Sequence, residues 1–213
     1  MALFYNCNDA SVRTAALASA AHCLAGGELV VLPTDTVYGI GADAFDSAAV
    51  AALLAAKGRG RDMPVPVLVG SWTTIDGLVT SVDRRTRDLI EAFWPGGLTL
   101  VIEHAPSLAW DLGDTRGTVA VRMPLHPVAI ELLELTGPLA VSSANRTGQA
   151  AALTAEQAQL QLGNDVAVYL DGGQAVTGIA STIVDVTGEV PKLLRAGAVD
   201  LDALREVVPD IAG

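Results

Sequence analysis

The 213-residue sequence has few of the residues that build covalent or metal cross-links. Its cysteines are Cys7 and Cys23, and its three histidines, His22, His104 and His126, are scattered along the chain. Neither set has the spacing of metal ligands, so we expect no transition-metal site built from side chains. We expect both thiols to be reduced, as in a cytoplasmic protein, rather than joined in a disulfide.

Long hydrophobic runs are also missing. No stretch approaches the roughly 18 consecutive apolar residues of a membrane span, and the first ten residues lack the basic and apolar regions of a secretory signal. We therefore expect a cytoplasmic protein with no membrane segment. Basic residues are scarce too, with 13 Lys and Arg against 24 Asp and Glu and a net charge of -11. This charge opposes indiscriminate binding to polyanions but is compatible with a small anionic substrate such as a nucleotide.

Aromatic residues make up only 4 % of the chain, whereas hydrophobic residues make up 51 %. The core must therefore be built mainly from Ala, Val, Leu and Ile. This length suits one domain with a substantial core. We find no repeat, low-complexity linker or clear domain boundary, so a single domain over residues 1–213 is the simplest interpretation.

Apolar runs and helical patterns alternate along the chain, which indicates an α/β fold. We expect helices over residues 10–24 (capped by Asn8), 46–57, 84–93, 126–135 and 201–207, and another opening at the capping-box pair Thr154 and Gln157. Strands are expected over residues 29–32, 65–69, 98–102, 119–123, 138–142, 166–170, 182–186 and 193–194.

Polar and basic groups follow several of these strands, where ligand sites of open α/β sheets lie. Segment 34–41 (TDTVYGIG) has two hydroxyls and a carboxylate that suit an amino acid, and glycines that let backbone N–H groups approach a ligand. A capped turn is the competing interpretation. Segment 57–61 (KGRGR) has three cations that suit phosphate, although a solvated helix C-terminus explains it equally well. It lacks the P-loop pattern.

Segment 142–148 (SSANRTG) offers hydroxyls and an amide that suit phosphate oxygens or a ribose. A serine nucleophile does not fit, because no Gly-x-Ser-x-Gly elbow surrounds it, and a plain polar loop is the alternative. Segments 118–122, 178–182 and 194–197 each place a hydroxyl or an arginine at a strand end. Taken singly, each of these three is more typical of a structural turn.

Read together and in order, these groups resemble the YrdC/Sua5 family of threonylcarbamoyl-AMP synthases. The matching segments run from about residue 32 to 199 and are PTDTVYGIGADAF, KGRGRDMPVPVLV, FWPGGLTLVI, TVAVRMP, SSANRTG, GIASTIVDV and LLRAGAV. One such motif is a weak signal, but seven in the family's order are specific. The Lys-x-Arg of residues 57–59 followed by the Ser-x-Asn of residues 143–145 is the most diagnostic part.

The resemblance implies a single α/β (α+β) domain, with a motif-bearing core of about residues 8–200. Its twisted mixed β-sheet and flanking helices would surround a concave, positively lined cleft. Family members use L-threonine, bicarbonate and ATP to make threonylcarbamoyl-AMP and pyrophosphate, and Mg²⁺ is expected with the ATP. A separate threonylcarbamoyl transferase then passes the group to adenosine 37 of tRNA.

Matching positions imply roles for nine residues. ATP and its phosphates would be bound by Lys57, Arg59, Thr118, Ser143, Asn145 and Arg195, of which Lys57 and Arg59 would also be catalytic. L-Threonine would be bound by Thr36, Arg122 and Ser181, with Arg122 on its carboxylate.

The chain departs from the family pattern at Met63 and Leu68, where the family often has Asn and His, and at Gly60, where a proline is usual. Because the sequence ends soon after the last motif, we class it with the short, single-domain form. The main alternative is a double-stranded-RNA or ribosome-maturation module without catalysis, against which the acidic net charge argues. A second is the carbamoyl-transfer domain of hydrogenase-maturation proteins, whose fused acylphosphatase and zinc-finger modules are absent here. Direct contact with tRNA or double-stranded RNA stays open.

Overall fold

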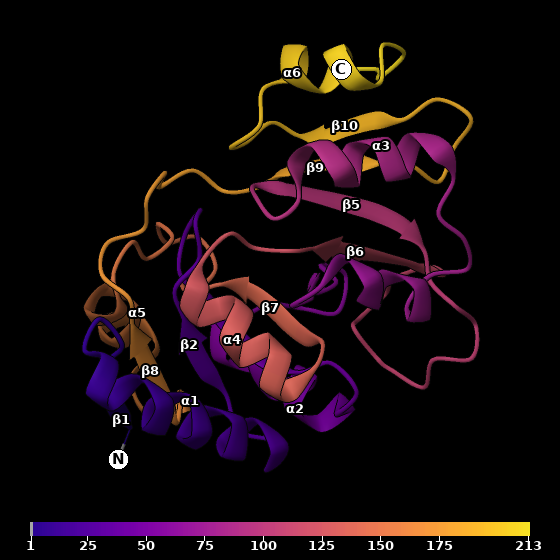
Figure 1. Ribbon diagram of the computed structural model, residues 1–213. Coiled ribbons are helices and arrows are strands. Elements are labelled where there is room, and N and C mark those ends of the chain that lie inside the picture. Colours follow the sequence, from indigo (N-terminus) through magenta and orange to yellow (C-terminus); the bar gives the residue numbers. More distant parts are fainter. Residues whose placement is uncertain (1) are drawn as a thin grey trace.

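A ten-stranded sheet runs through the computed structural model, which describes residues 2–213. The strand order is β1-β8-β2-β3-β7-β4-β6-β5-β9-β10 (Figure 1). The strands are β1 (Leu3–Asn6), β2 (Val30–Leu32), β3 (Gly39–Asp43), β4 (Val67–Leu68), β5 (Leu98–Glu103), β6 (Thr118–Arg122), β7 (Leu139–Ser143), β8 (Val168–Asp171), β9 (Thr182–Asp185) and β10 (Lys192–Arg195). Four pairs are parallel (β1 with β8, β8 with β2, β4 with β6, β5 with β9) and the others are antiparallel, so the sheet is mixed, as predicted.

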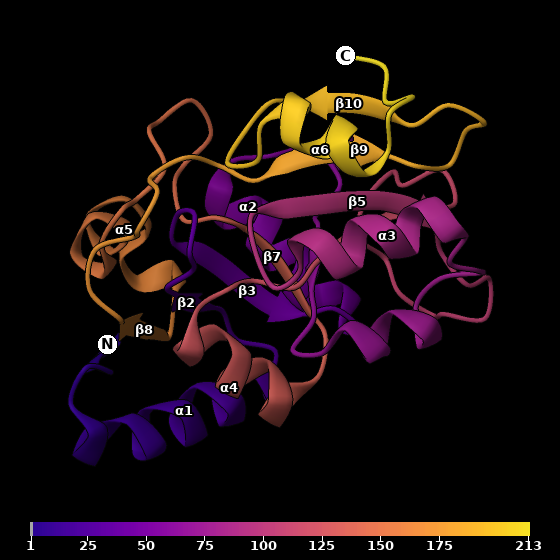
Figure 2. The same ribbon diagram turned by 45° about the horizontal axis from the view of Figure 1, so that its top comes forward.

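Helices flank this sheet in two groups. The helices are α1 (Ala10–Ala25), α2 (Ser47–Lys57), α3 (Arg84–Phe93), α4 (Pro127–Thr136), α5 (Ala155–Leu162) and α6 (Leu201–Val207), with short 3₁₀ turns η1 (Trp72–Gly77) and η2 (Gly163–Asp165). Helices α1 and α4 lie side by side, whereas α3 and α6 lie near β5, β9 and β10 (Figures 1 and 2). No helix within residues 2–213 is long and apolar enough to cross a membrane.

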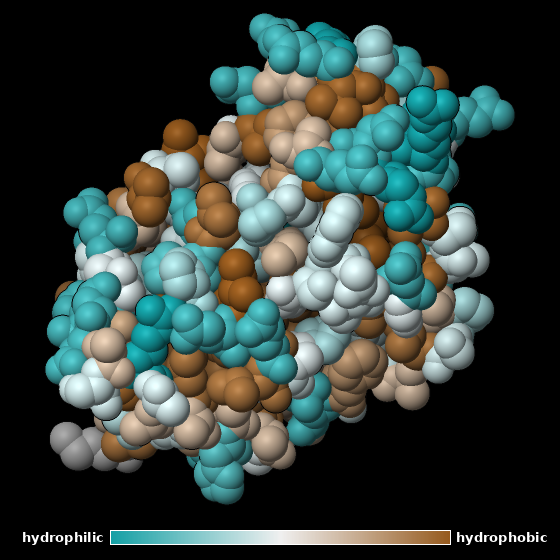
Figure 3. Space-filling view, viewed as in Figure 1, coloured by the Kyte–Doolittle hydropathy of each residue, from teal (hydrophilic) through white to brown (hydrophobic). Residues whose placement is uncertain are grey.

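The core has two parts because side chains alternate between the faces of each strand. In β2, Val31 belongs to a larger cluster with residues of α2, α3 and α5, whereas Val30 and Leu32 pack with α1 and α4. All three side chains are fully buried. Small alanines on α1 and α2 let these helices lie close to the sheet, which is how a core with so few aromatics is filled. The outer face of α3, by contrast, is hydrophilic (Figure 3).

The caps explain where several helices begin and end. Helices α3 and α6 have the predicted bounds, and Asp83 caps α3 by accepting a hydrogen bond from the Thr86 amide at 2.8 Å. The prediction that Asn8 caps α1 is wrong, because Asp9 accepts the Ser11 amide at 2.9 Å. Adjacent Asn and Asp are both good caps, so sequence alone does not choose between them.

Strand β3 lies where the sequence analysis expected part of a ligand loop. Gly39 and Gly41 are poor strand formers, yet β3 pairs with both β2 and β7 in the middle of the sheet. A Cβ on Gly39 would come within 2.6 Å of Val141 Cγ1. The glycine therefore allows a close approach between neighbours, and only residues 33–38 form the turn. The edge strand β1 was also missed, and β4 is shorter than predicted.

Candidate functional site

A cavity of about 290 Å³ opens where loops from distant parts of the chain meet. The turn before β3 lies beside the loop after β7, because Gly39 pairs with Ser143. The end of β6, the start of β9 and the end of β10 complete the wall. A larger hollow of about 610 Å³ lies beside β1 and α2, but no Lys, Arg or His of the described chain lines it. We therefore place the candidate site in the smaller, cationic cavity.

Six of the nine predicted site residues line this cavity. They are Thr36, Arg59, Arg122, Ser143, Ser181 and Arg195. The structure thus brings residues as far apart as Thr36 and Arg195, 159 positions along the chain, into one concave site. Lys57, Thr118 and Asn145 do not lie on its wall.

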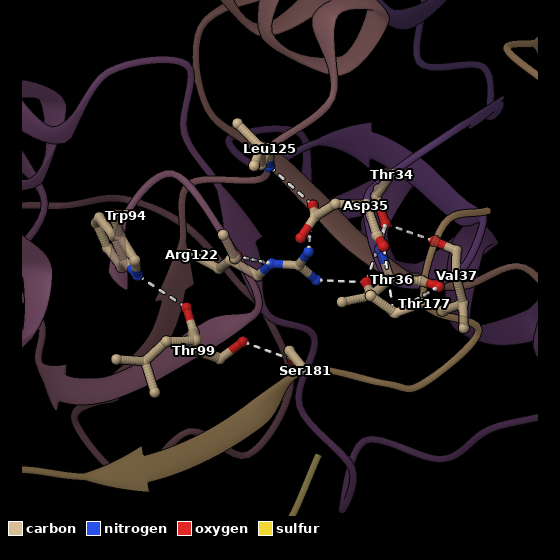
Figure 4. A network of polar contacts seen from close by, with 12 residues as sticks. Thr34, Asp35, Thr36, Val37, Trp94, Thr99, Arg122, Leu125, Thr177 and Ser181 are labelled. Atoms are coloured by element: carbon tan, nitrogen blue, oxygen red, sulfur yellow. Dashed lines mark hydrogen bonds and ion pairs between the residues drawn. The ribbon is translucent and has the colours of Figure 1, made fainter. Parts of the chain in front are cut away.

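Arg122, at the end of β6, is fixed from three sides (Figure 4). Its Nε donates to the Gly96 carbonyl at 2.8 Å, Nη1 donates to Thr36 Oγ1 at 2.8 Å, and Nη2 contacts Asp35 Oδ1 at 2.6 Å. Burial lowers the pKa of Arg122, while the neighbouring Asp35 carboxylate raises it. The guanidinium is therefore held rigidly, with its second Nη hydrogens available to a ligand.

Asp35 was not among the predicted site residues, although the sequence analysis noted its turn. Its Oδ1 accepts from Arg122 and also from the Leu125 amide at 2.8 Å, and its side chain is only 13 % exposed. The carboxylate thus ties the turn before β3 to the end of β6. The nearby Thr34 hydroxyl donates to the Val37 carbonyl at 2.6 Å, so the 3.0 Å contact between the hydroxyls of Thr34 and Thr36 has Thr36 as donor.

Arg195 and Ser181 form a second fixed group. Arg195 Nη2 donates to the Ser181 carbonyl at 2.7 Å and to Ser181 Oγ at 3.0 Å, and Ser181 Oγ lies 2.8 Å from Thr99 Oγ1. Thr99 also lines the cavity, but its position within an apolar strand gave no sequence signal. Burial, and then the nearby charge of Arg59, lower the pKa of Arg195. Two cations therefore face one space, which favours an anion between them.

Arg59 reaches the cavity from the segment after α2. Its Nη1 donates to Ser142 Oγ at 3.3 Å, and its buried Nε has no hydrogen-bond partner in the described chain. Because this Nε is buried, the guanidinium can meet a ligand in the cavity only through its Nη groups. Arg61, by contrast, is exposed and forms a bidentate pair with Asp111 at 2.8 and 2.9 Å.

The three residues away from the wall have protein partners. Lys57 is fully buried, and its Nζ donates to the carbonyls of Ser143 and Asn145. Asn145 donates its amide to the Gln149 carbonyl at 2.9 Å, and Thr118 Oγ1 donates to the Thr115 carbonyl at 2.8 Å. Two of the three residues that depart from the family pattern differ in position, since Leu68 lines the cavity whereas Met63 is 38 % exposed and does not.

Comparison with known proteins agrees with this picture. The family model Sua5_yciO_yrdC, described as telomere recombination, matches residues 22–197. This chain belongs to that family. A Mycobacterium tuberculosis relative is 61 % identical over 204 residues, covering 96 % of this chain and 94 % of its own length.

Two longer relatives match most of this chain. The threonylcarbamoyl-AMP synthase of Bacillus subtilis is 35 % identical over 207 residues, which cover 96 % of this chain and 60 % of that protein. The crystal structure of Pyrococcus abyssi Sua5 complexed with L-threonine superimposes with a TM-score of 0.88 at 35 % identity, over 92 % of this chain and 58 % of that one. The predicted family and fold class are therefore confirmed.

Proposed function

We propose that this protein is a threonylcarbamoyl-AMP synthase, a nucleotidyltransferase that uses L-threonine, bicarbonate and ATP. The observation that carries the proposal is the convergence of Arg59, Arg122 and Arg195 on one cavity that hydroxyl groups also line. Relatives named for this activity, and a relative bound to L-threonine, support it over an RNA-binding module. The net charge of -11 also disfavours a large phosphate-binding surface.

The proposed reaction has two steps. The amine of threonine adds to bicarbonate carbon with loss of water, which gives an N-carboxylate. An oxygen of that carboxylate then attacks the α-phosphorus of ATP, forming threonylcarbamoyl-AMP and releasing pyrophosphate. Both reactants in the second step are anions, so the protein's main contributions are to neutralise charge and to align the attack.

The geometry suggests how the substrates divide the cavity. We assign Arg122 to the threonine carboxylate, with the hydroxyls of Thr36 and Ser181 beside it. All three residues line the cavity and are held by neighbours, since Arg122 donates to Thr36 and the Ser181 hydroxyl contacts that of Thr99. A rigid arginine suits the planar carboxylate better than a mobile cation does.

We assign the phosphates of ATP to Arg59, Arg195 and Ser143. Arg59 lines the cavity, and Arg195 is near enough to Arg59 for the two charges to repel. A phosphate between them would relieve that repulsion. Thr118 lies four residues along β6 from Arg122, about 13 Å at strand spacing, and is our candidate for a contact at the far end of the nucleotide. Asn145, predicted to bind ATP, would act by shaping the loop after β7.

Magnesium is proposed to enter with the triphosphate. Within residues 2–213 no three His, Cys, Asp or Glu side chains are grouped to hold a metal ion. Mg²⁺ usually keeps several waters and binds substrate phosphates, so it does not require such a cage. Its role would be to neutralise phosphate oxygens, while the arginines above bind and orient the chain of phosphates.

The product is a reactive mixed anhydride, so a separate threonylcarbamoyl transferase is proposed to consume it during tRNA modification. We propose that this occurs in the cytoplasm. Both cysteines are free, with Cys7 buried, as expected in a reducing compartment. The acidic net charge disfavours direct contact between tRNA and this chain.

A pyrophosphate-release assay with each substrate omitted in turn tests the proposal. We expect release only when ATP, L-threonine and bicarbonate are all present. Replacing L-threonine with L-valine, which has a similar shape but no hydroxyl, tests recognition of the side chain. Pyrophosphate release that does not depend on threonine would refute the assignment. Tight RNA binding at physiological salt, independent of threonine, would favour the RNA-binding alternative.

A further inference from the structure

Lys57 differs from the arginines of the site in where its charge lies. Arg59, Arg122 and Arg195 line the cavity, but the Lys57 side chain is fully buried beneath it. Its Nζ donates to the backbone carbonyl of Ser143, to that of Asn145 at 2.7 Å, and more weakly to Asn145 Oδ1 at 3.5 Å. The N–H donors of the ammonium are therefore all used in hydrogen bonds within the protein.

The main chain of Lys57 holds the same segment. The Thr147 amide donates to the Lys57 carbonyl at 2.8 Å. This carbonyl is available to the Thr147 amide because α2 ends at Lys57, where Gly58 turns the chain with a left-handed φ of 64°. Lys57 thus contacts residues 143–149, which we call the β7 loop, through both its side chain and its main chain.

The β7 loop is closed on itself by Asn145. Its Nδ2 donates to the carbonyls of Arg146 and Gln149, both at 2.9 Å. Arg59, two residues after Lys57, donates to Ser142 Oγ just before the loop. Arg59 therefore contacts Ser142, whereas Lys57 contacts the next residue, Ser143, which lines the cavity.

The Lys57 ammonium has no carboxylate within ion-pair distance in the described chain. Carbonyl dipoles stabilise it instead. Burial, and then the charge of Arg59, lower the pKa of Lys57 to about 8. Its three tetrahedral N–H donors match the converging carbonyl oxygens, as a planar guanidinium would not.

We propose that Lys57 is a positioning residue that fixes the β7 loop, so that Ser143 and Arg59 are presented to the phosphates, rather than a direct phosphate ligand. This inference rests on the proposed function only in naming the ligand as phosphate. The way in which Lys57 holds the loop is independent of that assignment and is tested separately.

Reductive methylation of the wild-type protein tests the burial of the ammonium. The sequence has two lysines, Lys57 and Lys192, and Lys192 is exposed, so it serves as an internal control. We expect dimethylation of Lys192 and none of Lys57, with or without a non-hydrolysable ATP analogue. Modification of Lys57 in the free protein, with protection by the analogue, would identify it as a phosphate ligand and overturn the proposal.

Two variants test the loop. In Lys57→Met, hydrogen exchange of residues 143–149 should accelerate at least tenfold without substrate, while β5 keeps its protection. In the matched control Arg59→Met the loop should stay protected, but ATP binding should weaken at least tenfold. Lys57→Arg keeps the charge but not the donor geometry, so its loop should be as unprotected as that of Lys57→Met.

The kinetic readout separates positioning from binding. Lys57→Met should lower kcat by at least a hundredfold and leave the Kd for L-threonine within about twofold, because Arg122 is held independently. Unchanged loop exchange together with lost ATP affinity, or full activity in Lys57→Arg, would contradict the proposal. If wild-type protein makes no pyrophosphate, the proposed function fails, whereas the exchange and methylation results still decide the role of Lys57. The methylation result also decides it if the variants do not fold.

Discussion

The ion pair between Asp35 and Arg122 allows a quantitative test of the site. Its two side chains are 13 % and 7 % exposed, and the contact is 2.6 Å. Asp35→Ala would leave the Arg122 guanidinium buried without its counter-charge and would also remove the acceptor of the Leu125 amide. Breaking a buried pair in this way costs about 3–5 kcal/mol of unfolding free energy.

The exposed pair between Arg61 and Asp111 provides the matched control. This pair is bidentate, with contacts of 2.8 and 2.9 Å, but its side chains are 57 % and 43 % exposed. Solvent screens such a pair, so Asp111→Ala should cost at most about 1 kcal/mol. Both variants remove one acidic side chain, and their difference therefore reports burial rather than net charge.

Urea unfolding followed by circular dichroism measures both losses. We expect the midpoint of Asp35→Ala to fall much further than that of Asp111→Ala, with equal m-values. Asp35→Asn keeps an acceptor oxygen and should lie between Asp35→Ala and wild type. L-Threonine binding by calorimetry should weaken in Asp35→Ala alone, because Arg122 loses one of the three partners that fix it. Equal destabilisation by Asp35→Ala and Asp111→Ala would show that burial of the ion pair does not set the size of its contribution.

Three further predictions follow from other parts of the structure. Gly197→Ala should abolish L-threonine binding, measured by calorimetry, because a Cβ there would come within 2.6 Å of the Ser181 carbonyl oxygen. The control Gly77→Ala, at a position with open space around it, should bind L-threonine normally. Normal binding by both variants would contradict this prediction. Tyr38→Phe should cost about 1–3 kcal/mol in urea unfolding, because the buried hydroxyl bonds the loop after β8; a loss below about 0.5 kcal/mol would contradict it. Burial raises the pKa of the Cys7 thiol from 9.0 to about 11, so the stability it contributes is present below pH 9 and lost toward pH 11. Cys7→Ala should flatten that decline in unfolding free energy, and an unchanged pH profile would argue against it.

Local signals predicted the regular elements well. Helix α3 has both an Asp cap and a strong apolar stripe, and its bounds match the prediction. Strand β3 was missed because Gly39 and Gly41 carry no strand signal of their own. Its place in the sheet is decided by the close fit against Val141, which is about 100 residues away along the chain.

The site was predictable only in part. The cationic residues were found as motifs, but their convergence depends on the order β6-β5-β9-β10, which brings the ends of β6 and β10 to one cavity. From the sequence alone, the three cations of segment 57–61 are interpreted together, either as a phosphate site or as a solvated helix end. In the fold, Lys57 is buried, Arg59 faces the cavity and Arg61 pairs with Asp111 at the surface. Alternating residues thus have three different environments, which depend on long-range packing.

In the proposed reaction, this cavity joins threonine, bicarbonate carbon and the α-phosphate of ATP in one product. Mass spectrometry of the product made from ¹³C-bicarbonate tests it directly. We predict that threonylcarbamoyl-AMP forms and is heavier by one mass unit than the product made from unlabelled bicarbonate. An adenylate that forms without the label, as when threonine's own carboxylate attacks ATP, would contradict the account.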